Sequence, residues 1–261
     1  MLDLFEQQYP QMHVLCFGGG TDSTAILGGW KERGLPPFDA ILFADTGGER
    51  PHTYEHVKRT NEWLRANGQP QITMVRKAAR TVDDATLEGN CLRRGSLPGL
   101  AYGFKTCSQK YKMQPQEKWL NNSEQAKVVW KVGGKVHRYI GYEFSERRRW
   151  AKAPLEDDKC INHYPLVEWE WSRPECIDAI KRMRLPLPGK SSCFFCPAST
   201  KPEIDALKNT YPLLFQRALA MEDNAILKTV KGLGRRFSWR DYATTKEEPT
   251  VTPCLVCVDE S

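Results

Sequence analysis

The stretch that most constrains the fold of this chain is MHVLCFGGGTDST, residues 12–24. Its apolar start is too short for a helix and runs directly into three glycines, which predicts a buried strand that enters a tight turn. Apolar residues then recur at helical spacing as far as Gly34, so we expect a helix after the turn. In this geometry, backbone N–H groups and the positive end of the helix dipole converge on an anion. The glycines let the backbone approach that anion closely, and the expected anion is a phosphate.

The residues after the glycines decide which kind of phosphate loop is present. No lysine precedes the Ser/Thr pair, and Ser23 stands where the pattern G-x-G-x-x-G needs its third glycine, which excludes both common nucleotide loops. The run GGGTDST resembles the S-G-G-x-D-S-T signature of the PP-loop ATP pyrophosphatase superfamily, with Gly18 in place of the usual first serine. The alternative interpretation is an ordinary glycine-rich turn with a helix N-cap at Asp22 or Ser23.

Length and composition indicate a globular protein. With 261 residues the chain is long enough for one large domain or for a domain with an appendage. Hydrophobic residues make up 40% and charged residues 27%, which is not the composition of a disordered chain. The apolar runs are far shorter than a membrane span, and the N-terminus lacks the pattern of a signal peptide. We therefore expect a cytoplasmic protein without a membrane partner.

The formal net charge of +6 is a modest bias toward polyanions. The bias is visible locally in three basic clusters, which are Arg93-Arg94, Arg147-Arg148-Arg149 and residues 228–236. A solvated basic face is the alternative interpretation of each cluster.

After the first helix the chain continues as an alternation of strands and helices. Strands are predicted at 38–44 and 71–75, with a helix between them from Pro51 to about Asn67. Asp45 and Thr46 follow the second strand, so we expect them at the carboxyl edge of a parallel sheet, where open α/β sheets bind ligands. Segment 76–109 has little periodicity and is long for a loop, which indicates a functional role.

Two later motifs occur in the order found in the phosphoadenosine phosphosulfate reductase-like branch of the same superfamily. The segment CSQKYKMQP, with Cys107, Lys110 and Lys112, is similar to its C-[ST]-x-x-[YW]-K-x-x-P element. A strand predicted at 136–142 contains Gly141 and is followed by an acidic and arginine-rich segment, as in the pattern G-x-x-x-x-E-x-x-R. A guanidinium group is suited to gripping phosphate or sulfate oxygens.

Two further elements complete the resemblance. The run YPLVEW precedes a helix whose start is marked by a capping box of Ser172 and Glu175. A proline-rich linker then leads to SSCFFCP, which contains Cys193 and Cys196. The resemblance thus covers about residues 12–200.

Nine cysteines in a chain without a secretory signal point to metal or redox chemistry. Two pairs have the C-x-x-C spacing, Cys193/Cys196 and Cys254/Cys257, while Cys16 and Cys176 are expected to be small core residues. Three thiolates can hold a four-iron four-sulfur cluster and leave one iron open. A fourth thiolate from Cys91, Cys254 or Cys257 would close the cluster, and zinc is the alternative metal.

The resemblance implies an α/β fold with a doubly wound, mostly parallel sheet, helices on both faces and a small helical, cysteine-containing C-terminal region. We expect the nucleotide-binding domain at residues 1–185 and the C-terminal region at 186–261. Nucleotide contacts are expected from Gly18, Gly19, Gly20, Thr21, Asp22, Ser23, Thr24, Asp45, Thr46, Gly141 and Arg147. Catalytic contacts are expected from Asp22, Ser23, Lys110 and Arg148, and metal ligands are expected to be Cys107, Cys193, Cys196 and Cys91.

The implied cofactors are ATP or phosphoadenosine phosphosulfate, Mg²⁺ and a 4Fe–4S cluster. We interpret the chain as an enzyme that adenylates a substrate and then transfers sulfur or an amine, with tRNA or DNA as the acceptor class considered. A sulfur donor or a reductant protein would be a further partner. One alternative is a reductase of phosphoadenosine phosphosulfate or adenylyl sulfate, although the E-C-G-[IL]-H motif expected of such enzymes is absent. The other is a nucleic-acid-binding module with structural zinc and a degenerate loop.

Overall fold

The computed structural model describes residues 10–79 and 81–245, which divide into two compact units. Unit 1 contains the chain up to Asn90 together with Lys105–Phe194, and unit 2 contains Cys91–Phe104 together with the chain from Phe195. A segment from the middle of the sequence is therefore part of the C-terminal unit. The division into domains at 1–185 and 186–261 stays a prediction, because a compact unit need not fold independently.

Unit 1 is built on a five-stranded sheet with the order β3-β2-β1-β4-β5. Its strands are β1 (His13–Cys16), β2 (Ala40–Ala44), β3 (Ile72–Val75), β4 (Val136–Ile140) and β5 (Cys160–His163). All neighbouring strands are parallel. The strand order reverses between β1 and β4, which makes the sheet doubly wound. The predicted fold class is confirmed.

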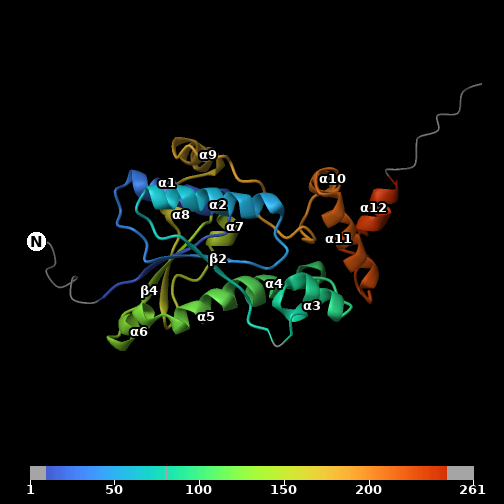
Figure 1. The fold of residues 1–261 in the computed structure, drawn as a ribbon, viewed down its shortest axis with the longest axis horizontal. Helices are drawn as coiled ribbons and strands as arrows, with labels where there is room; N and C mark the ends of the chain where they lie inside the picture. Colours follow the sequence, from blue (N-terminus) through green and yellow to red (C-terminus); the bar gives the residue numbers. More distant parts are fainter. Residues whose placement is uncertain (1–9, 80, 246–261) are drawn as a thin grey trace, which may run out of the picture. The chain divides into compact units, whose positions relative to one another are not determined.

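Helices cover both faces of this sheet (Figure 1). The longer helices of unit 1 are α1 (Thr21–Glu32), α2 (Pro51–Ala66), α5 (Gln114–Asn122), α6 (Glu124–Lys131) and α9 (Arg173–Arg182). Its shorter helices are α4 (Thr106–Ser108), α7 (Arg147–Trp150) and α8 (Pro165–Glu168), with a 3₁₀ turn at Asp83–Ala85 and a π-helical turn at Gln109–Met113. No helix in the described parts of the chain combines the length and apolarity needed to cross a membrane.

Alternation along the strands divides the core of unit 1 into two layers. Leu15, Ile41 and Phe43 pack in the layer with α1, α2 and α9, whereas Val14 and Leu42 pack in the layer with α5 and α6. Both faces of β1 and β2 are therefore apolar, as in strands of a buried parallel sheet. This burial explains why the runs at 12–17 and 38–44 are recognisable in the sequence.

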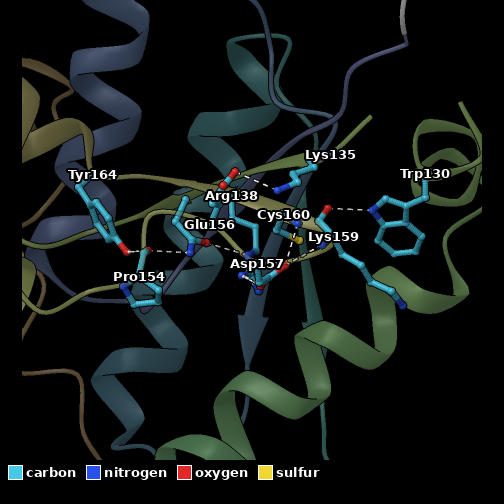
Figure 2. A network of polar contacts seen from close by, with 10 residues as sticks. Trp130, Lys135, Arg138, Pro154, Glu156, Asp157, Lys159, Cys160 and Tyr164 are labelled. Atoms are coloured by element: carbon cyan, nitrogen blue, oxygen red, sulfur yellow. Dashed lines mark hydrogen bonds and ion pairs between the residues drawn. The ribbon is translucent and has the colours of Figure 1, made fainter. Parts of the chain in front are cut away.

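The edge strand β5 is held mainly by polar contacts, and its sequence CINH carries no strand signal. Arg138 donates from Nε to Asn162 Oδ1 at 2.9 Å and from Nη2 to Asp157 Oδ2 at 2.6 Å. The other oxygen of Asp157 accepts the backbone N–H groups of Lys159 and Cys160 at 2.9 and 2.8 Å. Figure 2 shows how these side chains join β4, β5 and the loop before β5. Such a strand depends on partners that are distant in sequence.

Unit 2 is helical in its C-terminal part. It contains α10 (Lys201–Thr210), α11 (Pro212–Asn224) and α12 (Trp239–Thr245), as well as a 3₁₀ turn at Gly99–Tyr102. Helix α3 (Leu87–Arg93) spans the boundary between the two units. Phe215, Met221 and Trp239 are almost completely buried, so unit 2 has an apolar core of its own.

Three histidines form a stacked group on β1, β4 and β5. The rings of His13 and His137 are 5.0 Å apart, and those of His137 and His163 are 5.1 Å apart. His13 Nδ1 is 2.8 Å from the hydroxyl of Tyr139, and His137 Nδ1 is 2.8 Å from His163 Nε2. Burial is the largest cause of a lowered pKa in each of the three imidazoles. The folded protein therefore holds them in the neutral form.

We predict that the free energy of unfolding falls as the pH is lowered below the ordinary histidine pKa of 6.5. The unfolded chain takes up protons at that pH, whereas the folded chain does so only at the lowered pKa values, so stability is lost on acidification. Urea unfolding at about pH 7.5 and about pH 5.5 measures the effect. The variant His137→Gln should show a smaller difference between the two pH values, and His52→Gln is the control. Equal pH dependence in both variants would contradict this account.

Candidate functional site

The glycine turn connects β1 to α1 at the carboxyl edge of the sheet. Gly19 has a φ of +70°, and a Cβ atom there would lie 3.0 Å from Thr53 Cγ2 and 3.1 Å from Phe43 Cε2. A side chain at Gly19 would therefore be strained by the left-handed backbone conformation and would also contact Thr53 and Phe43 too closely. At Gly18 the nearest atom to an added Cβ is Ser23 Oγ, at 3.8 Å. Only the second glycine of the turn is strictly required by the fold.

The hydroxyl groups after the turn are directed back to it. Ser23 Oγ accepts the Gly18 N–H at 3.0 Å and donates to Gly20 O at 3.3 Å. Thr24 Oγ1 donates to the same carbonyl at 2.8 Å. Both hydroxyls therefore fix the shape of the turn, and their predicted phosphate contacts are untested.

The start of α1 leaves backbone donors for an anion. The first helical hydrogen bond is that of Thr24 N to Gly20 O at 3.2 Å, and the N-cap is Gly20, which has no side chain to cap the helix. The N–H groups of Thr21, Asp22 and Ser23 precede this bond and have no acceptor within the helix. An uncapped helix start behind a glycine turn is the geometry in which proteins bind phosphate.

His56, on α2, contacts the glycine turn through the hydroxyl group of Thr24. Its Nε2 lies 2.9 Å from Thr24 Oγ1, whose hydroxyl proton goes to Gly20 O. Burial is the largest cause that lowers the pKa of His56, to about 4. The imidazole is therefore neutral near pH 7 and acts as a buried hydrogen-bonding partner of α1.

Asp22 is paired with an arginine from a distant element. Arg173, at the start of α9, donates from Nη1 to Asp22 Oδ1 at 2.7 Å and approaches Glu143 Oε2 at 3.6 Å. Gly141, after β4, packs against the same residues, because a Cβ there would be 3.0 Å from both Asp22 Cβ and Ser23 N. Gly141 thus lies beside the glycine turn, and its nucleotide contact stays a prediction.

Several charges act on the Asp22 carboxyl group. Burial raises its pKa, the Arg173 guanidinium opposes this rise, and the carboxylates of Glu146 and Glu143 add to it. Removal of Arg173 would leave Asp22 and Glu143 without the cation that they share. The arginine therefore counteracts the rise in the pKa of Asp22 and orients its carboxylate.

Residues 189–194 cross the turn and the connection between β2 and α2. The hydroxyl of Ser191 donates to Gly18 O, and Phe194 N donates to Gly48 O at 2.8 Å. Cys193 forms an isolated antiparallel bridge with Glu49. The segment that carries the first cysteine of SSCFFCP is thus anchored beside the glycine turn.

The carboxylate of Asp45 is fully buried and hydrogen bonded within the protein. Its Oδ1 accepts from Gly47 N at 2.8 Å and from the Tyr54 hydroxyl at 2.7 Å, and its Oδ2 accepts from Arg76 Nε at 2.8 Å. The Thr46 hydroxyl accepts from Gly48 N at 3.2 Å and is 3.1 Å from Cys193 Sγ. A nucleotide contact from either side chain, as expected from the sequence, would have to replace one of these bonds.

Glu49 and Arg50 are buried charges that the sequence did not single out. The exposed fractions are 4% for Glu49 and 5% for Arg50. Among the described residues, neither carboxylate oxygen of Glu49 has a hydrogen-bond partner, although Lys112 Nζ approaches Oε1 at 3.3 Å. Lys112 lies in the π-helical turn that follows Cys107, so this ion pair connects the Cys107 element to the Cys193 segment.

The four predicted metal ligands are divided between the units. Cys107 and Cys193 belong to unit 1, and Cys91 and Cys196 belong to unit 2. In the described part of the chain, no three side chains of His, Cys, Asp or Glu are grouped so that they could hold a metal ion. Cys254 and Cys257 lie outside the described residues. The shared site of these thiols stays a prediction.

The two cysteines expected in the core have elevated pKa values. Burial raises the pKa of Cys176 to about 12 and that of Cys16 to about 11. Cys176 lies on α9 and is fully buried. Both therefore remain neutral thiols near pH 7.

The predicted basic contacts are exposed. Lys110, Arg147 and Arg148 have exposed side chains in the π-helical turn and in α7. Arg149 instead pairs with Glu146 and lies over the Tyr142 ring at 4.7 Å. The proposed anion contacts of Lys110, Arg147 and Arg148 are untested.

Arg173 and Ser191 are the site residues that the sequence reasoning missed. Arg173 was interpreted only as part of a helix start, where a cation opposes the helix dipole. This unfavourable position of a cation could have indicated that a carboxylate lies nearby to compensate for it. Ser191 offered no comparable signal.

Comparison with known proteins gives weak similarity in overall structure. No protein-family profile and no curated protein matches the sequence. Phosphoadenylyl-sulfate (PAPS) reductase from Candida auris in its phosphate complex aligns with a TM-score of 0.41 and 16% identity, over 70% of this chain and 76% of that chain. The U34-tRNA thiolase NcsA from Methanococcus maripaludis with its [4Fe-4S] cluster aligns with a TM-score of 0.42 and 13% identity, over 97% of this chain and 77% of that chain.

We predict different tolerances at the first two glycines of the turn. Gly18→Ser should change the free energy of unfolding by less than ~0.5 kcal/mol, because an added Cβ meets only Ser23 Oγ at 3.8 Å. Gly19→Ser should cost at least ~1–2 kcal/mol from the left-handed backbone alone. Chemical denaturation of both variants measures the difference. Equal stability of the two would show that the turn is not held as described.

Proposed function

We propose that this chain is an ATP-dependent PP-loop enzyme that adenylates an oxygen of its substrate and then replaces that oxygen with sulfur or an amine. A substrate oxygen would attack the α-phosphate of ATP, and pyrophosphate would leave. A sulfur or nitrogen nucleophile would then displace AMP from the adenylated substrate. A nucleic acid base is the acceptor class that we favour.

The observation that carries this proposal is the uncapped start of α1 at the switch point of the sheet. The glycine turn after β1 and Gly141 after β4 lie against each other, at the crevice where doubly wound sheets bind nucleotides. The N–H groups of the first turn of α1 are available to phosphate oxygens. This arrangement supports nucleotide binding without any requirement for a lysine in the loop.

The residues around the turn would contribute mainly positioning. Ser23, Thr24 and His56 hold the turn through hydrogen bonds, while the ion pair with Arg173 orients Asp22. Because the donors are already in place, phosphate oxygens would be neutralised without rearrangement of the protein. Mg²⁺ would bind together with the nucleotide phosphates, because it is commonly coordinated by only one or two protein carboxylates. Asp22 is the candidate carboxylate nearest to the turn.

The thiols would hold the proposed cluster. Cys107, Cys193 and Cys196 are donors of the soft type that iron–sulfur clusters and zinc require, and Cys91 is the candidate fourth ligand. Cys193 is buried beside the glycine turn, which supports a site near the phosphates. When bound, a cluster with an open iron would bind the sulfur that is to be transferred.

We predict that Asp22→Ala and Arg173→Ala each weaken ATP binding or pyrophosphate release at least ~10-fold, a loss of about 1.4 kcal/mol. The physical reason is that each variant leaves the first turn of α1 without its orienting ion pair. Calorimetry with ATP and release of labelled pyrophosphate are the measurements.

The matched control is Arg182→Ala, which removes another ion pair between α9 and α1, at 2.6 Å from Glu32 and remote from the turn. ATP affinity should be retained in this variant. Unchanged affinity in folded Asp22→Ala protein would refute the nucleotide site, and pyrophosphate release distinguishes this function from a reductase or a binding module.

We predict that Cys107→Ser, Cys193→Ser and Cys196→Ser each abolish iron content and activity, because a site that loses one thiolate leaves the others unsatisfied. Cys16→Ser and Cys176→Ser are the controls and should lower stability only. Visible absorbance and metal analysis of anaerobically purified protein separate iron–sulfur from zinc. Iron that persists in both Cys193→Ser and Cys196→Ser would exclude this C-x-x-C pair as ligands.

A further inference from the structure

Unit 2 brings two distant basic segments side by side. Asn224 Nδ2 donates to Leu92 O at 2.7 Å across 132 positions of sequence. Ile226 N donates to Gly95 O at 2.8 Å, and Arg235 Nε donates to Leu100 O at 2.8 Å. Residues 226–236 are thus fastened to the segment Cys91–Phe104.

These two segments hold an unbalanced positive charge. They contain six basic residues and no acidic residue. The six side chains are all exposed: Arg93, Arg94, Lys228, Lys231, Arg235 and Arg236. Since the net charge of the whole chain is +6, the rest of the chain has as many acidic as basic residues. We call these two segments together the basic surface of unit 2.

Two carboxylates, those of Glu222 and Asp223, precede residues 226–236 and accept hydrogen bonds from backbone N–H groups and from Arg240. Glu222 is 5% exposed and accepts the N–H groups of Leu233 at 2.6 Å and Trp239 at 2.9 Å. Asp223 accepts from Arg240 Nε at 2.8 Å. The partners in these hydrogen bonds are backbone N–H groups and Arg240, not the six basic side chains.

The buried carboxylate of Glu222 also fixes the shape of the basic turn. A Cβ at Gly232 would lie 2.3 Å from Glu222 Oε2, so a side chain cannot fit there. Lys231 N donates to Arg235 O at 2.9 Å, and Arg235 has a φ of +63°. A turn that is ordered in advance loses little conformational entropy when a partner binds. A merely solvated basic face would need no such support.

We propose that the basic surface of unit 2 binds the phosphodiester backbone of a nucleic acid. Exposed Lys and Arg side chains in two joined segments that contain no acidic residue can replace the counterions of a polyanion, and the released ions drive binding. Such contacts position a nucleic acid without reading its bases. The inference rests on the proposed function only in treating the bound nucleic acid as the acceptor.

The test is fluorescence anisotropy with labelled single-stranded RNA, single-stranded DNA and duplex DNA of one sequence, in the absence of ATP. The logarithm of the affinity should fall linearly with the logarithm of salt concentration. The variant Arg94→Ala/Lys228→Ala/Lys231→Ala should bind at least ~10-fold more weakly at low salt, with a salt slope smaller by about 2–3.

The matched control is Lys58→Ala/Lys118→Ala/Lys131→Ala, which removes the same charge from exposed helical positions of unit 1. It should retain the affinity and the salt slope of the original protein. The probe bound most tightly identifies the class of nucleic acid. An equal loss in the control, or the absence of salt-dependent binding to all three probes, would overturn the proposal.

Failure of this inference and failure of the proposed function are distinguishable. Asp22→Ala should keep oligonucleotide binding, because Asp22 belongs to unit 1. The triple variant of the basic surface should keep ATP affinity. Loss of oligonucleotide binding in Asp22→Ala would contradict the assignment of binding to unit 2.

Discussion

The close approach of backbone segments at the carboxyl ends of β1 and β4 is the constraint on which unit 1 depends. Gly19 and Gly141 lie where an added Cβ would come within about 3 Å of neighbouring atoms. Because the strand order reverses between β1 and β4, the connections after these strands leave the sheet in opposite directions and open a crevice between them. The glycines allow the start of α1 to reach that crevice with its backbone donors.

Ion pairs between carboxylates of low exposure and partly exposed cations then fix the segments around the crevice. The carboxylates of Asp22, Asp45 and Glu49 follow the first two strands and meet Arg173, Arg76 and Lys112, respectively. Each cation comes from a later element of the chain. A buried charge without its partner is costly, so these pairs tie distant segments to one edge of the sheet. The same electrostatic order keeps a positive helix start accessible to an anionic ligand.

Unit 2 uses a buried carboxylate for a different purpose. Glu222 is buried and accepts hydrogen bonds from the backbone N–H groups of Leu233, Trp239 and Arg240. Backbone N–H groups can stabilise a buried carboxylate by hydrogen bonding, so Glu222 does not require a basic side chain as its partner. The basic surface and the glycine turn thus belong to separate units, each ordered by its own polar core.

The sequence by itself determined the strand, turn and helix at 12–34, the parallel α/β alternation and the capping box at Ser172, because these depend on residues close together in the chain. It also predicted that the glycines of the turn let the backbone approach a phosphate. Only the tertiary structure decided that Arg173 pairs with Asp22, that three histidines stack across β1, β4 and β5, and that Asp45 is used within the protein. It also decided that segments 91–104 and 226–236 join. These facts depend on strand register and on contacts between different elements of the chain, some of them more than one hundred positions apart. Local patterns of hydrophobicity and turn residues do not encode such contacts.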